Sequence, residues 1–416
     1  MKNKNSTIRY AIRIMLLIIQ FCFGILFSDG RVQVFAQDAD KSGIDWLAEG
    51  FSELLSGEPV EIARLRELSV ADSDEGHYEY YFNQLNDSEK RCYREILNGV
   101  RNFESEFYLS FSDDDIINRS YHAVTLDHPE IFWIHNREKV YKTTYSRGDY
   151  CLFEPGYTHI GEEYDEICQS MEAAYEEIKA LLPEGAQEYD IAKTVYTYLI
   201  EQVTYIPSED DQSLAGSLWK MEAVCAGYAG AFQYLMERFG IYCIYVEGNS
   251  LNNDEGHAWN IIMLDEEFYY VDVTNGDQPD FLEGDAKYLE EHKTIIYDYL
   301  CPFPEEYEKT YQAIQDFPLP QCTSVTCNFY VMNLGCIYEY NWEDVLEYCR
   351  MRIDNGAAVV RFKCFDQDVY EALKTDWVDG DSMKEVAQYY MQQHELEEIE
   401  YHFGVLDNLY TVYYMF

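Results

Sequence analysis

The sequence predicts an α+β protein of several domains, organised around a helix and a pair of antiparallel strands in residues 224–277. Apolar residues recur at helical spacing from Ala226 to Phe239, and Gly240 suits a helix C-terminus. Residues 258–264 and 268–274 have the pattern of two strands joined by a tight polar turn. A βαβαββ order of short elements near the end of the chain indicates a further small α+β domain.

A cysteine, a histidine and an aspartate lie at the ends of these central elements. Cys225 begins the predicted helix, where the partial positive charge of the N-terminus favours a thiolate. Taken singly, Cys225, His257 and Asp272 fit a small buried side chain, a hydrogen-bonded histidine and a strand end. Taken together, they supply a nucleophile, a general base and a residue that orients the base. The grouping favours catalysis over three unrelated structural roles.

The strand register decides whether the histidine and the aspartate meet. If a two-residue turn pairs Leu264 with Glu267, Trp259 falls opposite Asp272. His257 then lies two residues along on the same face, as a diagonal neighbour of Asp272. A slip of one residue would turn His257 to the other face. The pattern therefore permits the pair without requiring it.

The blocks Val-Cys-Ala-Gly-Tyr-Ala, His-Ala-Trp-Asn and Tyr-Val-Asp-Val-Thr resemble the three signature blocks of the transglutaminase-like superfamily of papain-related cysteine enzymes. The resemblance covers about residues 165–280 and implies a papain-like core. It implies that Cys225 is the nucleophile, His257 the base and Asp272 the orienting acid. Tyr228 and Trp259, within the same blocks, are the expected substrate-binding residues. Because the family includes transglutaminases, peptidases and peptide N-glycanases, the resemblance specifies attack on an amide better than it specifies a substrate.

A tetrahedral intermediate also needs donors that stabilise its oxyanion. The backbone N–H of Cys225 is the first candidate, and the side-chain amide of Gln212, in the preceding loop, is the second. The indole of Trp219 is a weaker third. The side chains of Gln212 and Trp219 fit ordinary loop or packing roles equally well.

The first 36 residues predict a secretory signal peptide. Four basic residues precede an apolar run from Ile14 to Phe27, and Val34-Phe35-Ala36 offers a cleavage point. The run is shorter than the ~20 apolar residues of a spanning helix. An uncleaved N-terminal anchor is the alternative, and no second membrane segment follows. We therefore expect a secreted or cell-surface protein that does not engage the membrane once the signal is removed.

The chain carries 30 basic and 77 acidic residues, a net charge of −47. Nucleic acids and anionic membranes are polyanions, so neither is an expected partner. A cationic partner or simple solubility fits the charge better, and the expected partner is a protein or peptide substrate, including one at a cell surface. With 16% aromatic residues and 39 tyrosines, the composition predicts a packed core rather than a disordered chain.

The twelve cysteines contain no C-x-x-C pair, which argues against a zinc ribbon or a dithiol redox motif. The acidic run at 112–115 lacks the glycine and terminal glutamate of a calcium loop. We therefore expect no metal and no cofactor. Cys22 would leave with the signal, and the odd number that remains gives at least one free thiol, a role that Cys225 fits. We expect few disulfides, because the spacings show no compact framework.

The predicted organisation is a signal peptide at 1–36, a helical and α+β region at 37–160, a core at 161–320 and a C-terminal α+β domain at 321–416. Helices are expected at 38–68 (broken near 57–59), 87–103 with Asp87 as N-cap candidate, 112–126, 162–182, 187–203, 342–354, 366–374 and 382–394. Further strands are expected at 131–134, 139–145, 241–247, 326–339, 357–364, 398–403 and 410–414, with 279–320 irregular.

Hydrolysis of amides is the favoured activity, because no sequence feature indicates a site that holds an amine and excludes water. The alternative is a silent fold that serves as an extracellular binding module, with Cys225 buried and unreactive. A peptide N-glycanase activity is less favoured without paired C-x-x-C motifs.

Overall fold

In a computed structural model of the chain, the described residues are 78–134, 150–314, 316–380 and 382–416, with short segments at 26–28, 31–33, 61–62, 65 and 141–144. The predicted signal peptide lies outside them except for a hairpin of β1 (Leu26–Ser28) and β2 (Arg31–Gln33). The predicted helix over 38–68 also lies outside them, apart from three residues. Within the described part, no helix has the length and apolar character needed to cross a bilayer.

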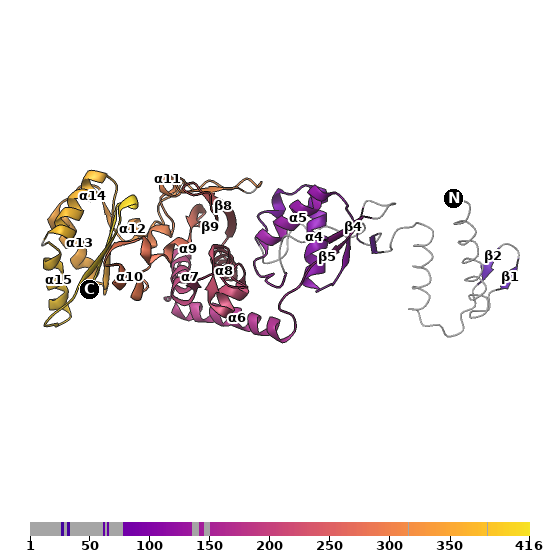
Figure 1. Cartoon of the computed structure of the whole chain (residues 1–416), viewed down its shortest axis with the longest axis horizontal. Helices are drawn as coiled ribbons and strands as arrows, with labels where there is room; N and C mark the ends of the chain where they lie inside the picture. The colour runs from indigo at the N-terminus through magenta and orange to yellow at the C-terminus, as the bar shows by residue number, and fades with distance from the viewer. Residues whose placement is uncertain are drawn as a thin grey trace.

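The structure mixes helices and strands, which confirms the predicted α+β class. Figure 1 shows three parts in a row, with the core between an N-terminal part and a C-terminal part. In the N-terminal part, α4 packs against α5 beside a sheet of order β3-β5-β4. Its elements are η1 (Phe82–Gln84), α4 (Asp87–Arg101), β3 (Phe107–Leu109), α5 (Asp114–Asp127), β4 (Tyr141–Thr144) and β5 (Cys151–Glu154).

Two predictions for this part were wrong. The N-cap of α4 is Asn86 rather than Asp87, because the Asn86 side chain and Glu89 form a reciprocal capping box. The strand expected at 131–134 is a turn whose Ile134 makes only an isolated bridge to Tyr157. Its aromatic residues pack in a cluster, where Phe132 stacks on Tyr164, so their apolar character reflects core packing.

The core packs α8 against a four-stranded sheet of order β10-β9-β8-β12. Its helices are α6 (Glu162–Leu181), α7 (Glu188–Gln202), η2 (Gly216–Lys220), α8 (Cys225–Arg238) and α9 (Val273–Gly276). Its strands are β6 (Thr204–Tyr205), β7 (Glu222–Ala223), β8 (Cys243–Ser250), β9 (Gly256–Leu264), β10 (Glu267–Val271) and β12 (Tyr311–Ala313).

The β9–β10 register is the predicted one, with Leu264 opposite Glu267. Asp265 and Glu266 form the two-residue turn with φ of 50° and 69°, as a type I′ hairpin requires. The second strand ends at Val271 rather than residue 274, because the Asp272 side chain accepts a hydrogen bond from the backbone and starts the short helix α9. Because the strand ends here, the Asp272 side chain becomes part of the site described below.

One face of α6 is buried in the core. Leu181 is 63% exposed, whereas Ile167, Met171, Ala174 and Ile178 face the core. Their spacing follows the helical period along the full length of α6.

The segment expected to be irregular, 279–320, contains η3 (Pro279–Phe281), β11 (Glu283–Gly284), α10 (Ala286–Glu291), η4 (Tyr297–Tyr299), α11 (Pro304–Tyr307) and β12. β12 pairs with β8 in the core, whereas β11 pairs with β15 in the C-terminal sheet. The segment therefore connects both sheets.

The C-terminal part is a five-stranded sheet of order β11-β15-β16-β14-β13, covered by helices (Figure 1). Its elements are α12 (Phe329–Met332), β13 (Cys336–Ile337), α13 (Trp342–Asp354), β14 (Val359–Cys364), α14 (Gln367–Lys374), η5 (Thr375–Asp379), α15 (Ser382–Gln393), β15 (His402–Leu406), η6 (Asp407–Leu409) and β16 (Thr411–Met415). The prediction of a long strand at 326–339 was wrong. Asn328 caps α12 in this segment, and the remaining strand, β13, has two residues.

Candidate active site

Cys225 is the first residue of α8 and is partly buried. The backbone N–H of Val224 donates to the carbonyl of Asp211 at 3.0 Å, which ties the start of α8 to the loop before it. That loop lies so close that a Cβ on Gly227 would stand 2.3 Å from the Asp211 carbonyl oxygen. Glycine is therefore required in the first turn of the helix.

The strand pair brings His257 and Asp272 together, as the predicted register allows. The Nε2 atom of His257 lies 2.7 Å from Oδ2 of Asp272. The two side chains are 10% and 0% exposed. The His257 ring also interacts with the Cys225 side chain, which contributes to its electrostatics. The structure thus places the three residues in one connected group.

The electrostatics of this group favour a protonated histidine. Burial alone would lower the pKa of His257, but the Asp272 carboxylate outweighs it, and the Cys225 sulfur adds to the effect. Together they raise the pKa of His257 to about 10. An imidazolium beside the sulfur stabilises a thiolate, which is the reactive form of cysteine.

The buried carboxylate of Asp272 is fully satisfied by neighbouring donors. Its Oδ1 accepts from the backbone N–H of Asn275 at 3.0 Å. Its Oδ2 accepts from the Asn275 side chain at 2.7 Å and from the Tyr307 hydroxyl at 2.9 Å, in addition to His257. These bonds fix the carboxylate towards the imidazole.

Two aromatic side chains, which also contact each other, pack against the histidine ring. Tyr311 stacks on His257 with ring centroids 4.6 Å apart, and Trp259 stacks on it at 5.9 Å. The Tyr311 hydroxyl also accepts a hydrogen bond from the Asn275 side chain at 2.7 Å. Tyr307 and Tyr311 come from α11 and β12, so a segment after the strand pair completes the site.

Tyr307, Tyr311 and Asn275 were missed by the sequence reasoning. Asn275 follows Asp272 by three residues, the spacing of a capping partner, which is a usable signal. Tyr307 and Tyr311 lie four residues apart in a stretch with no regular pattern among 39 tyrosines, so nothing in the sequence distinguishes them.

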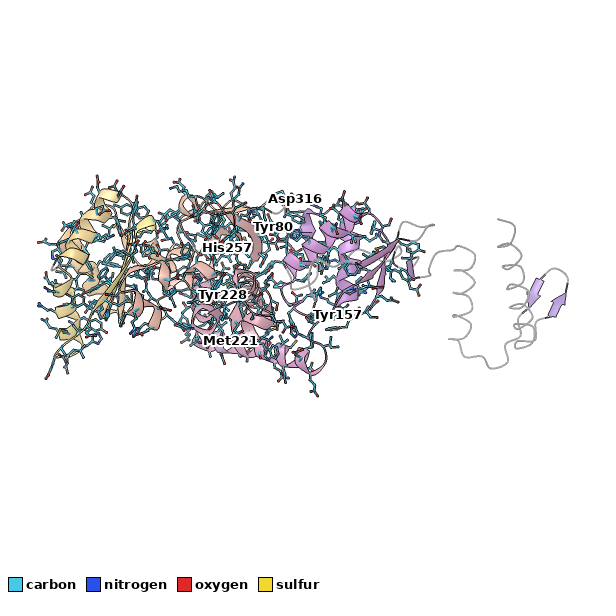
Figure 2. All side chains as sticks on the ribbon, in the orientation of Figure 1. Tyr80, Tyr157, Met221, Tyr228, His257 and Asp316 are labelled. Atoms are coloured by element: carbon cyan, nitrogen blue, oxygen red, sulfur yellow. The ribbon has the colours of Figure 1, made fainter. Side chains whose placement is uncertain are left out.

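The other predicted site residues lie around this group in different ways. Gln212 is exposed and lines a cavity next to α8. Trp219 packs edge-on against His159 and is partly buried. Tyr228 is 0% exposed and donates to Asp277, and Trp259 is 3% exposed. Tyr228 and Trp259 therefore support the site from inside the core and present almost no surface to a substrate. Figure 2 labels His257 and Tyr228 in the core.

No group of three or more histidine, cysteine or carboxylate side chains within the described part of the chain has the arrangement of a metal site.

Comparison with known proteins identifies the core. Residues 179–273 match the family model of the transglutaminase-like superfamily. This part of the chain is a transglutaminase-like core. The match contains Cys225, His257 and Asp272, whereas Tyr307 and Tyr311 lie beyond it.

Two solved structures are similar to this chain. One is a TGase, 12% identical with a TM-score of 0.25, where the match covers 41% of this chain and 50% of the other. The other is a proposed cysteine protease from Cytophaga hutchinsonii, 14% identical with a TM-score of 0.22, covering 33% and 61%. This chain thus spans half to three-fifths of either structure. No curated protein matches the chain.

Removing the Tyr307 hydroxyl is expected to weaken the hold on Asp272. Tyr307→Phe deletes one of three donors to Oδ2 and should lower stability by about 1 kcal/mol. It should also slow alkylation of Cys225 a few-fold near pH 6, with a smaller effect at pH 9, as a positioning role requires. Tyr270→Phe is the control, because its hydroxyl binds the carboxylate of Glu308 away from Asp272. Equal effects of the two changes on the pH profile would contradict this role.

Proposed function

We propose that the protein is a cysteine enzyme that hydrolyses peptide or side-chain amides through a thioester on Cys225. The observation that carries the proposal is the 2.7 Å contact between His257 and Asp272, joined to Cys225 at a helix N-terminus. A nucleophile, a base and an orienting carboxylate in hydrogen-bond reach of one another suit this chemistry.

In the proposed reaction, the Sγ atom of Cys225 attacks the carbonyl carbon of the amide and forms a carbon–sulfur bond. His257 gives its proton to the departing nitrogen as the carbon–nitrogen bond breaks. A water molecule then attacks the thioester carbonyl and gives a proton to His257. The carbon–sulfur bond breaks, which releases the acid and restores the thiolate.

The oxyanion would be stabilised near the start of α8. The first N–H groups of a helix have no partner within the helix, so the backbone N–H of Cys225 can donate to it. Gln212 remains the side-chain candidate, because the hydrogen bond that the Asp211 carbonyl accepts from the Val224 N–H holds its loop against the start of α8.

Hydrolysis is proposed over cross-linking because a water molecule is always at hand, whereas an amine acceptor needs a site that excludes water. We also propose secretion, on the basic and apolar pattern of residues 1–36. Proteins or peptides at the cell surface are the proposed partners, since the net charge of −47 disfavours nucleic acids.

The rate of Cys225 alkylation by iodoacetamide between pH 4 and 9, read by peptide mass spectrometry, tests this function. With the pKa of His257 raised to about 10, the ring keeps its proton across this range. We therefore expect fast labelling already at pH 5–6 in the wild type. In His257→Ala, labelling should rise only near the free-thiol pKa of about 8.5.

A wild-type profile that rises only near that value and is unchanged by His257→Ala would overturn the enzyme proposal. It would favour a binding module with an unreactive cysteine. Cys336, which is also partly buried, serves as the internal control for general thiol reactivity.

A further inference from the structure

A cavity of about 570 Å³ lies beside the candidate active site, between the N-terminal part and the core. On one side it is lined by the end of α5 and the residues that follow it, including Pro129 and Phe132. On the other side it is lined by the loop 209–214, α8 and β8. Figure 1 shows the N-terminal part, with α4 and α5, next to the core that carries α8 and β8.

The floor of the cavity is one face of α8 that begins at the nucleophile. Ala226, Gly230 and Gln233 line it, at the spacing of successive turns. Ala226 directly follows Cys225. A Cβ on Gly230 would meet only one atom, Leu214 Cδ2 at 4.0 Å, so the space above this residue is open. A bound side chain can therefore lie along α8 and approach Ala226, the residue next to Cys225.

Acidic side chains dominate the charge of the cavity lining, which includes Glu209, Asp210, Asp211 and Glu247. Two of these carboxylates, Asp210 and Glu247, pair with a lysine or a histidine. Asp210 pairs with Lys220 and with His159 at 2.9 Å.

Glu247 lies 2.9 Å from His122. The one histidine in the lining, His128, has its side chain fully buried and contacts Glu130 at 2.9 Å. It therefore presents no unmatched positive charge to the cavity.

Neither Glu209 nor Asp211 forms an ion pair with a described residue, and Lys220, whose charge interacts with Glu209, does not line the cavity. Glu209 is exposed, and Asp211 uses Oδ2 to accept from the backbone N–H of Ser208 at 3.0 Å. Gln233, 2% exposed, donates through Nε2 to the Leu126 carbonyl, while its Oε1 has no hydrogen-bond partner in the described chain. The cavity thus combines unmatched negative charge with a spare acceptor.

We propose that this cavity, here named the acidic cleft, binds a lysine or arginine side chain of the substrate whose amide Cys225 attacks. The proposal rests on the proposed function, because it assigns the substrate class of the same site. A cationic side chain supplies the charge that Glu209 and Asp211 lack. Its aliphatic stem fits against the small residues Ala226 and Gly230.

Matched covalent probes test the acidic cleft. Dipeptidyl vinyl sulfones that carry lysine, arginine, norleucine or glutamate at either of their two positions differ mainly in charge. The measured quantity is the second-order rate of Cys225 modification. We expect lysine and arginine to react about tenfold faster than norleucine at one position, and glutamate slowest. The preference should shrink in 0.5 M NaCl, because salt screens partly exposed charges.

Two sets of variants test whether the preference for lysine over norleucine arises in the acidic cleft. Gly230→Leu fills the space above α8 and should remove the advantage of lysine over norleucine, whereas Gly230→Ala, which adds only a methyl group, should keep it. Glu209→Gln with Asp211→Asn should also reduce the advantage to less than twofold. The control is Glu397→Gln with Glu398→Gln, the same change of net charge at exposed residues of the C-terminal part.

The outcomes separate this inference from the proposed function. Iodoacetamide labelling of each variant reports whether the Cys225–His257 pair is intact. Slow labelling of the wild type would overturn the proposed function. Fast labelling with equal rates for lysine and norleucine, or a preference that survives the Glu209 and Asp211 changes, would overturn the acidic cleft alone. If Gly230→Leu disturbs labelling, the charge variant decides.

Discussion

Asp272→Asn is expected to slow alkylation of Cys225 at pH 6 by up to about 300-fold, because a thiol that returns to the free pKa of about 8.5 is only about 0.3% thiolate at that pH. In the structure, Oδ2 of Asp272 accepts from His257, Asn275 and Tyr307. An amide nitrogen at that position would face three donors. The reversed amide would face the backbone N–H of Asn275 instead.

The same clash should lower the free energy of unfolding by about 2–4 kcal/mol, because the group is fully buried. Iodoacetamide labelling at pH 6 and urea unfolding measure the two effects. Asp280→Asn, at an exposed residue, is the control. Wild-type labelling in Asp272→Asn would mean that His257 does not depend on this carboxylate.

The second large effect is expected far from the cysteine, at Lys363 in β14. Its side chain is 2% exposed, and Nζ lies 2.9 Å from Glu306 and 2.8 Å from the Leu409 carbonyl. It also lies 3.7 Å from Asp298, which is 1% exposed. Lys363→Met should lower the free energy of unfolding by about 3–5 kcal/mol, because it leaves buried carboxylates without their cation.

Lys374→Met is the matched control. Lys374 also pairs with a carboxylate, Asp407, but the two side chains are 25% and 46% exposed. Exposed pairs contribute about 0–1 kcal/mol, so this variant should unfold near the wild-type urea concentration. Similar midpoints for the two variants would show that the Lys363 cluster is well hydrated and not a buried ionic network.

The central site could be predicted from sequence where short-range rules apply. A two-residue turn determines the β9–β10 register, and the register determines which side chains face Asp272. The start of α8 follows from apolar spacing, and its last residue, Arg238, lies close to the predicted end. These features depend on residues close together in the chain.

Features that depend on distant contacts could not be predicted. Tyr307 and Tyr311 reach the site because β12 pairs with β8, some sixty residues earlier in the chain, and no local pattern specifies that pairing. The turn at 131–134 was mistaken for a strand because apolar aromatic residues suit a strand and a core cluster equally. Tyr228 and Trp259 were expected to bind substrate, but both are buried, and burial depends on packing that a motif does not reveal.

The stretch that follows Asp272 is held by both sheets. The backbone N–H of Asp272 donates to the Tyr299 carbonyl at 3.0 Å. The neighbouring residue, Asp298, accepts from the hydroxyls of Tyr330, Thr411 and Tyr413, each at 2.6 Å. The C-terminal sheet thus supports the backbone segment that holds the acid of the site. The core that ends near residue 320 is therefore not structurally independent of that sheet. Proteolytic removal of the C-terminal sheet is therefore expected to loosen the backbone next to Asp272, while the side-chain bonds from His257, Asn275 and Tyr307 remain.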